Sequence, residues 1–248
     1  MIRRVVGWTG EVLVTLGVLV LLFVAWQLWW TDVVAERAQQ QIVRSLTHDF
    51  AAEGPGPAAV TGDTYPGLGG SRAFAVIRVP RFGADYARPV VEGVDAPQLA
   101  LGVGHYEGTA RPGRVGNFAV AGHRTTYGRP FHDIDTLRPG DRVIVETKPR
   151  VFVYEVTGDE IVRPWQTEVI APVPDEVGAR PTERLLTMTS CHPKYSATYR
   201  YVTHARLVRT VPRARWHLED WDRVTDAAGP AGPDPAAAPV PRTATGGS

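Results

Sequence analysis

Residues 142–156 read Arg-Val-Ile-Val-Glu-Thr-Lys-Pro-Arg-Val-Phe-Val-Tyr-Glu-Val. Two runs rich in β-branched and aromatic residues, 142–146 and 151–156, flank the tripeptide Lys148-Pro149-Arg150. Runs of this composition favour extended strands, and a short interruption that contains proline favours a turn. The stretch therefore predicts a β-hairpin.

Similar short runs recur on both sides of this hairpin, and turn residues end each of them. They cover residues 73–79, 89–92, 117–121, 184–188 and 201–211. Because few helical periods separate them, about seven or eight strands are expected in a sandwich or a small closed barrel, rather than in a sheet of alternating strands and helices. The predicted fold class is all-β.

The N-terminal region contains a long apolar stretch, residues 12–30, in which Gln27 is the only strongly polar side chain. At about 1.5 Å per residue, a helix of this length crosses roughly 30 Å of hydrocarbon. Arg3 and Arg4 precede the stretch, and three tryptophans lie near its far end. A membrane-spanning helix typically has positive charge on its cytoplasmic side and aromatic side chains at the membrane interface. The alternative is a cleaved signal peptide, but the exit, Trp29-Trp30-Thr31-Asp32, offers no cleavage site between small residues.

We therefore expect a single-pass protein of the cell membrane, with its N-terminus in the cytoplasm and its globular domain outside. Val34, Ala38, Ile42 and Leu46 recur at every fourth position, which predicts an amphipathic stalk helix. The expected parts are a cytoplasmic N-terminus at 1–11, an anchor at 12–30, a stalk and Gly/Pro-rich linker at 31–72, a globular domain at 73–212, and a largely disordered extension at 213–248.

The charge of the chain excludes one class of partner. Its 27 Lys and Arg residues nearly balance its 26 Asp and Glu residues, so the formal net charge is +1. No basic run interleaved with aromatic residues is present. No nucleic acid partner is therefore expected.

Cys191 is the single cysteine of the chain and lies at the end of the run 184–188. Exported proteins usually pair their cysteines, so an unpaired one outside the membrane is a candidate nucleophile. The alternative is a buried, inert thiol. His123, at the end of the run 117–121, is a candidate base, and Arg200, after a short loop, lies where an adjacent strand returns toward Cys191. Each of these two side chains has the alternative reading of a solvated surface group.

A zinc site formed by Cys191 and His123 with His192 and His204 is a further possibility. The chain has no pair of cysteines spaced by two residues, so this reading is disfavoured and no metal is expected.

Taken together, residues 73–211 resemble a sortase, one of the membrane-anchored cysteine transpeptidases of Gram-positive bacteria. The family signature Thr-Leu-x-Thr-Cys is matched by Thr187-Met188-Thr189-Ser190-Cys191, with Met for Leu and Ser for the second Thr. His123 and Arg200 match the family's His and Arg. The segments Gly104-His105-Tyr106, Gly116-Asn117-Phe118 and Cys191-His192-Pro193 are most similar to class E.

The resemblance implies a closed eight-stranded β-barrel with short helices, and a two-step acyl transfer without a cofactor. Cys191 would attack the Thr–Gly bond of a Leu-Ala-x-Thr-Gly sorting signal at the C-terminus of an exported protein. His123 would transfer protons, and Arg200 would hold the carbonyl or oxyanion. The acceptor would be an amine of a peptidoglycan precursor.

The same resemblance assigns substrate contacts to Tyr106, Thr189 and Ser190, although Tyr106 has the alternative role of packing over the barrel rim. The acidic residues of the loop before the nucleophile strand lie where some sortases hold calcium, or they form a solvated surface. They are Glu168, Asp175, Glu176 and Glu183.

Two rival functions remain open from the sequence. An L,D-transpeptidase also combines Cys, His and Arg on a β-rich fold, but its Ser-x-Gly-Cys motif is absent because Ser190 directly precedes Cys191. The other rival is a membrane-tethered binding module without catalytic activity.

Overall fold

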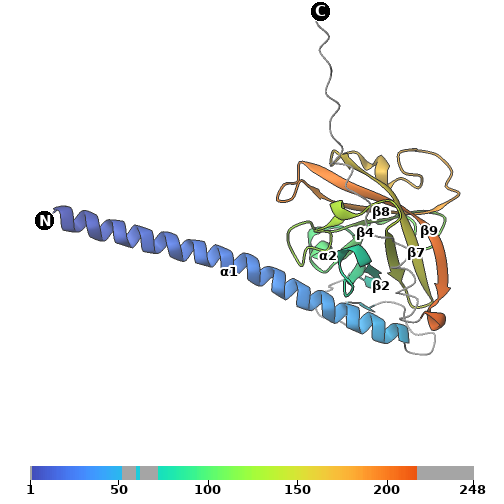
Figure 1. Cartoon of the computed structure of the whole chain (residues 1–248), viewed down its shortest axis with the longest axis horizontal. Coiled ribbons are helices and arrows are strands. Elements are labelled where there is room, and N and C mark those ends of the chain that lie inside the picture. The colour runs from blue at the N-terminus through green and yellow to red at the C-terminus, as the bar shows by residue number, and fades with distance from the viewer. Residues whose placement is uncertain (1, 52–59, 62–71, 217–248) are drawn as a thin grey trace, which may run out of the picture. The chain divides into compact units, whose positions relative to one another are not determined.

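The computed structural model describes residues 2–51, 60–61 and 72–216. Its strands form one sheet in the order β1-β2-β3-β4-β5-β8-β9-β7-β6, and an additional pairing of β2 with β6 closes β2–β9 into an eight-stranded barrel (Figure 1). The strands are β1 Val60–Thr61, β2 Arg72–Arg78, β3 Arg88–Glu92, β4 Val103–His105, β5 Gly116–Ala121, β6 Arg142–Glu146, β7 Arg150–Val162, β8 Arg184–His192 and β9 Tyr199–Pro212. The all-β prediction is confirmed, and the barrel replaces the sandwich alternative.

Short helical segments lie between the strands and directly after the last one. They are the helix α2 at Ala96–Ala100 and the 3-10 turns Pro80–Phe82, Ile134–Thr136, Thr167–Ile170 and Arg213–Arg215. The predicted linker, apart from β1, and the extension beyond residue 216 fall outside the described residues.

The hairpin predicted at residues 142–156 is present, since β6 and β7 pair antiparallel with Ile144 opposite Val153. Several strands are longer than the sequence pattern indicated, and β7 and β8 exceed it most. β7 continues to Val162, and β8 continues to His192, which places Cys191 inside a strand. β4 was not predicted, because three residues carry too little pattern to be recognised.

The core lies inside the barrel and is filled by alternate side chains of its strands. Phe118 and Val120 of β5 and Leu186 and Met188 of β8 are each no more than 1% exposed. Because neighbouring side chains of a strand point to opposite faces, the residues between them face outward. By this alternation Cys191, the candidate nucleophile, faces outward from β8.

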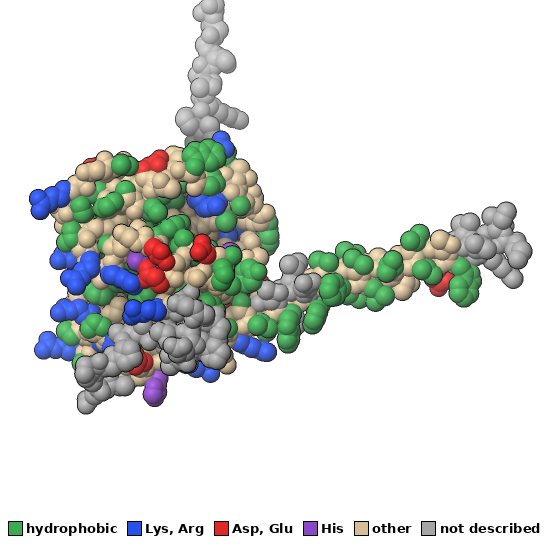
Figure 2. Space-filling view, turned by 180° about the vertical axis from the view of Figure 1, so that it is seen from behind, with side chains coloured by type: hydrophobic (Ala, Val, Ile, Leu, Met, Phe, Trp, Pro, Cys, Tyr) green, Lys and Arg blue, Asp and Glu red, His purple; other side chains and the backbone are tan. Residues whose placement is uncertain are grey.

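The N-terminal region is one continuous helix, α1, from Ile2 to Ala51. Its segment Gly7–Val24 has a mean hydropathy of 2.0 and is long and apolar enough to cross a membrane. Figure 2 shows apolar side chains along this part of the helix, and the described ones are exposed.

The C-terminal part of α1 packs on the barrel. Its buried face is formed by Ala35, Gln39, Ile42, Val43, Leu46 and Phe50. The apolar members from Ile42 onward contact β2, β3 and Ala87. The stripe predicted at every fourth residue is right for Ile42 and Leu46, but Val34 is 46% exposed. A helix has about 3.6 residues per turn, so a spacing of four drifts around its surface.

Candidate active site

Cys191 and Arg200 lie directly opposite each other in the antiparallel pair β8–β9. Arg200 in turn lies opposite Val162 of β7. Residues directly opposite in an antiparallel pair point to the same face, with Cβ atoms about 4.5–5.5 Å apart. The thiol and the guanidinium therefore project from one row on the outside of the barrel.

His123 joins this row from the other side of β8. The parallel pair β5–β8 ends with Ala121 level with Thr189. The Gly122 N–H then donates to the Thr189 carbonyl at 3.0 Å, so the hydrogen bonding between the two strands continues one residue further. Continuing this register places His123 level with Cys191. The three residues chosen from the sequence are thus brought to one end of three neighbouring segments.

The imidazole of His123 is partly buried. Its ring centroid lies 5.2 Å from that of Tyr127, at an interplanar angle of 34°. Burial lowers the pKa of His123 from its ordinary value of 6.5, because the charged ring loses solvation. Among the residues that the structure describes, none bonds to its Nε2. This nitrogen is therefore not committed to a structural hydrogen bond.

The guanidinium of Arg200 is held by the turn that joins β8 to β9. Its Nη1 donates to the carbonyls of Ala197 and Tyr199, both at 3.0 Å. These bonds use one nitrogen, and no described residue bonds to its Nε or Nη2. A planar fork with donors to spare suits a carbonyl oxygen that gains negative charge.

Arg124 is a site residue that the sequence analysis did not select. It is 2% exposed, pairs with Asp135 at 2.6 Å, and donates to the carbonyls of His132 at 2.8 Å and Cys191 at 3.3 Å. It therefore fastens the segment after His123 to the backbone of the nucleophile. An arginine beside a histidine has no distinctive sequence signal, because its burial depends on strands distant in the chain.

Thr189 and Ser190 face opposite sides of β8. Thr189 shares the outer face with Cys191, and its hydroxyl lies 3.0 Å from the phenolic oxygen of Tyr106 and 3.4 Å from the Val120 carbonyl. Ser190 is 3% exposed, and its hydroxyl donates to the Gly122 carbonyl at 2.8 Å. Tyr106 and Thr189 thus lie on the side of Cys191, whereas Ser190 braces the backbone next to His123.

Three other histidines have polar partners of their own. His105 lies 2.9 Å from Glu92 and 3.1 Å from the Ala110 carbonyl. His132 bonds to the Arg124 carbonyl at 2.9 Å. His204 lies 3.0 Å from both Thr187 and Glu160. Their polar partners make them weaker candidates than His123 for proton transfer.

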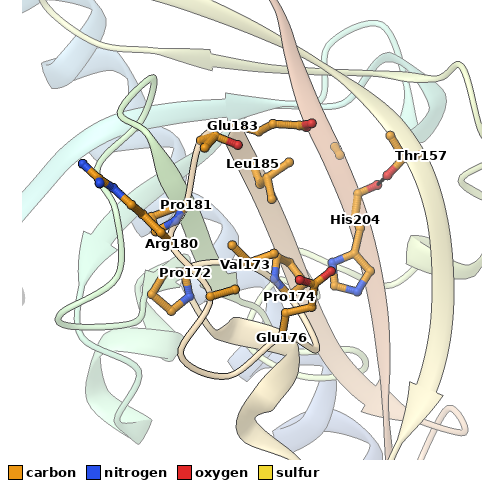
Figure 3. Close-up of a pocket in the computed structure, with 13 residues that line it drawn as sticks. Thr157, Pro172, Val173, Pro174, Glu176, Arg180, Pro181, Glu183, Leu185 and His204 are labelled. Atoms are coloured by element: carbon orange, nitrogen blue, oxygen red, sulfur yellow. Dashed lines mark hydrogen bonds between the residues drawn. The ribbon is translucent and has the colours of Figure 1, made fainter.

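A pocket of about 450 Å³ lies between the β7–β8 loop and β9, and Cys191 does not line it (Figure 3). Of the predicted acidic residues, Glu176 and Glu183 line this pocket. Asp175 groups with Glu160 and His204, whose side-chain oxygen and nitrogen atoms lie within 4.8 Å of one another, and His204 also lines the pocket. Burial, followed by the charge of Glu160, raises the pKa of Asp175.

The row of thiol, imidazole and guanidinium has the parts that acyl transfer needs. A thiol supplies the nucleophile, an imidazole moves protons, and a guanidinium stabilises an oxyanion. All three come from barrel strands or their ends, so the barrel fixes their spacing.

Comparison with known proteins agrees with this arrangement. A family model described as a sortase domain matches residues 77–208. Sortase SrtE1 of Streptomyces coelicolor is 38% identical over 214 residues, which are 83% of this chain and 58% of that protein, so the chain spans less than two thirds of that relative. The solved sortase E of Streptomyces avermitilis has 43% identity and a TM-score of 0.53, over 58% of this chain and 94% of the solved one. Sortase E1 of Streptomyces coelicolor, solved with a tripeptide in its active site, has 34% identity and a TM-score of 0.54, over 58% of this chain and 93% of the solved one.

Proposed function

Because the chain belongs to the sortase family of transpeptidase enzymes, we propose that it cleaves a Leu-Ala-x-Thr-Gly sorting signal between Thr and Gly. It then joins the acyl product to a peptidoglycan amine. The observation that carries this proposal is the strand register that aligns Cys191 with Arg200 and, through the end of β5, with His123. The tripeptide bound in the active site of sortase E1 supports a peptide substrate.

In the first half-reaction, the sulfur of Cys191 attacks the carbonyl carbon of the signal's Thr. The thiol proton passes to His123, and Arg200 stabilises the oxyanion that forms. The bond to the Gly nitrogen then breaks, and His123 returns the proton to this leaving amine. The products are a thioester on Cys191 and the released C-terminal part of the signal.

In the second half-reaction, the incoming amine attacks the thioester carbonyl. His123, now neutral, accepts a proton from the attacking nitrogen and passes it to the departing sulfur of Cys191. An amide bond replaces the thioester, and the thiol is restored. The lowered pKa of His123 keeps the imidazole in its neutral form near pH 7.

Tyr106 and Thr189 support the choice of Ala at the second signal position. If the single Thr189 proton bonds to the Val120 carbonyl, the Tyr106 hydroxyl donates to Thr189. The phenolic oxygen then keeps acceptor capacity facing the site. An Ala at this position has a backbone N–H that requires an acceptor, and a Pro has none.

The exposed apolar segment of α1 supports a single-pass placement in the cell membrane. Arg3 and Arg4 at its start favour a cytoplasmic N-terminus, with the barrel outside. This placement sets the enzyme where exported proteins and peptidoglycan precursors meet.

The direct test uses the full chain in detergent micelles with a Leu-Ala-x-Thr-Gly peptide and an amine acceptor. The wild type should give both the cleaved and the transferred product. Cys191→Ala should give neither, while its thermal unfolding stays like that of the wild type. Transfer at a substantial rate by Cys191→Ala would contradict the proposal.

A further inference from the structure

The loop that follows His123 contains an unusual backbone turn. Tyr127, Gly128 and Arg129 have φ values of 51°, 72° and 46°. We refer to these three residues as the helix-facing turn. Residues other than glycine rarely adopt this left-handed region, and they remain there only where surrounding contacts hold them.

The helix α1 contacts every residue of the helix-facing turn. Gln39 Nε2 donates to the Tyr127 carbonyl at 2.8 Å. Asp32 accepts a bond from the Gly128 N–H at 3.4 Å, and its other oxygen lies 3.5 Å from Arg129 Nε. The backbone conformation of the turn is therefore fastened from the helix that also carries the apolar N-terminal segment.

Gln39 is the buried polar residue on the face of α1 that packs on the barrel, and it is 0% exposed. Burying an N–H donor is unfavourable unless it is hydrogen-bonded, and the Gln39 Nε2 also donates to the Ala100 carbonyl at 3.3 Å. A Cβ on residue 128 would lie 3.1 Å from the Gln39 amide. Gly128 thus permits both the left-handed backbone and the close approach of the helix.

The turn reaches the catalytic histidine through Tyr127, whose ring lies against that of His123. We propose that α1 is part of the active site, with Gln39 as a positioning residue that holds Tyr127 against His123 and Asp32 as its partner in fixing the turn. The role given to His123 rests on the proposed function. The contacts between α1 and Tyr127 do not.

The test uses Gln39→Leu in the full chain, in detergent micelles, because leucine keeps most of the buried volume and removes the donor. In this variant Tyr127 should no longer be held against the His123 ring. The less well positioned ring should lower kcat by roughly tenfold and leave KM little changed. The NMR resonances of the His123 ring, assigned by their loss in His123→Ala, should move toward those in Tyr127→Leu, where the aromatic neighbour is gone.

Asp32→Ala provides a second variant at a more exposed position, so it separates positioning from folding. It should change kcat and the His123 resonances in the same direction, by a smaller amount. Gln40→Leu and Asp49→Ala are the matched controls on the same helix. Gln40 makes none of the contacts named above, and Asp49 pairs with Lys148 instead. Both controls should behave like the wild type.

Wild-type kcat and wild-type His123 resonances in both Gln39→Leu and Asp32→Ala would overturn the proposal. If Gln39→Leu does not fold, the Asp32→Ala result decides alone. If the wild type fails to process the peptide, the proposed function is wrong, but the resonances still show whether α1 holds Tyr127 against His123.

Discussion

At the scale of single residues, chemistry depends on side chains whose surroundings are set by neighbours far apart in the sequence. Burial removes solvent from His123, whose ring lies beside that of Tyr127, and Arg124 joins the segment after His123 to the Cys191 carbonyl. The residue types alone made a thiol, an imidazole and a guanidinium candidates for catalysis, and the resemblance to a sortase indicated acyl transfer. Their environments determine how each one acts.

The pH dependence should report the desolvation of His123. Acyl transfer needs the neutral imidazole, so the rate should fall as the pH drops through the pKa of His123, which burial places below 6.5. Tyr127→Ala should uncover the ring, raise this pKa and move the acid limb to higher pH. The fall of the rate at low pH can be measured from the hydrolysis of preformed acyl-enzyme, because water as the acceptor does not titrate in this range.

Cys191 is level with His123 in the strand register, and the ring of Tyr127 lies beside the His123 ring. NMR titration of the His123 ring in the Cys191→Ala background removes the influence of the thiol. An acid limb at or above pH 6.5 in the wild type, or one that Tyr127→Ala leaves in place, would count against this account.

Tyr106 should determine the choice between two signals. Tyr106→Phe removes the phenolic oxygen, so processing of a Leu-Ala-x-Thr-Gly peptide should weaken by about 1 kcal/mol, or severalfold in kcat/KM. A Leu-Pro-x-Thr-Gly peptide, which lacks the backbone donor, should be affected much less. Equal losses on both peptides would mean that Tyr106 only packs.

At the scale of elements, the sequence predicts most of the individual strands, but it does not predict which distant strands pair with each other. The hairpin at residues 142–156 was predicted because its turn and both strands are adjacent in the chain. The closure of β2 onto β6 and the parallel pair β5–β8 join distant segments, and no local signal encodes them. Gln39 was missed because a polar residue in a helical pattern normally indicates an exposed position.

The packing of α1 on the barrel predicts a marked loss of stability in Leu46→Ala. Leu46 is 0% exposed among Val76, Val91 and other apolar residues. Its truncation should lower the free energy of unfolding by about 2–5 kcal/mol. Denaturant titration of the full chain in micelles measures this, with the 46% exposed Val34→Ala as control. Equal effects of the two variants would show that α1 does not support the barrel.

At the scale of the whole molecule, one helix connects a membrane-compatible segment to a barrel that carries a candidate acyl-transfer site. The all-β class and the sortase family were correctly predicted from the sequence, the family from the motif around Cys191 together with His123 and Arg200. The roles of these residues remain predictions. The contribution of α1 to the site could not be predicted, because it depends on how the helix packs against a loop about 90 residues later in the chain.

The most direct test of the central claim is the mass of the protein after brief reaction with a Leu-Ala-x-Thr-Gly peptide in the absence of an acceptor amine. The wild-type full chain should gain the mass of the peptide's acyl part, ending at Thr. Digestion should locate it on Cys191 as a thioester that hydroxylamine removes. Cys191→Ala should gain no mass. Turnover without such an adduct, or an adduct on another residue, would contradict the account.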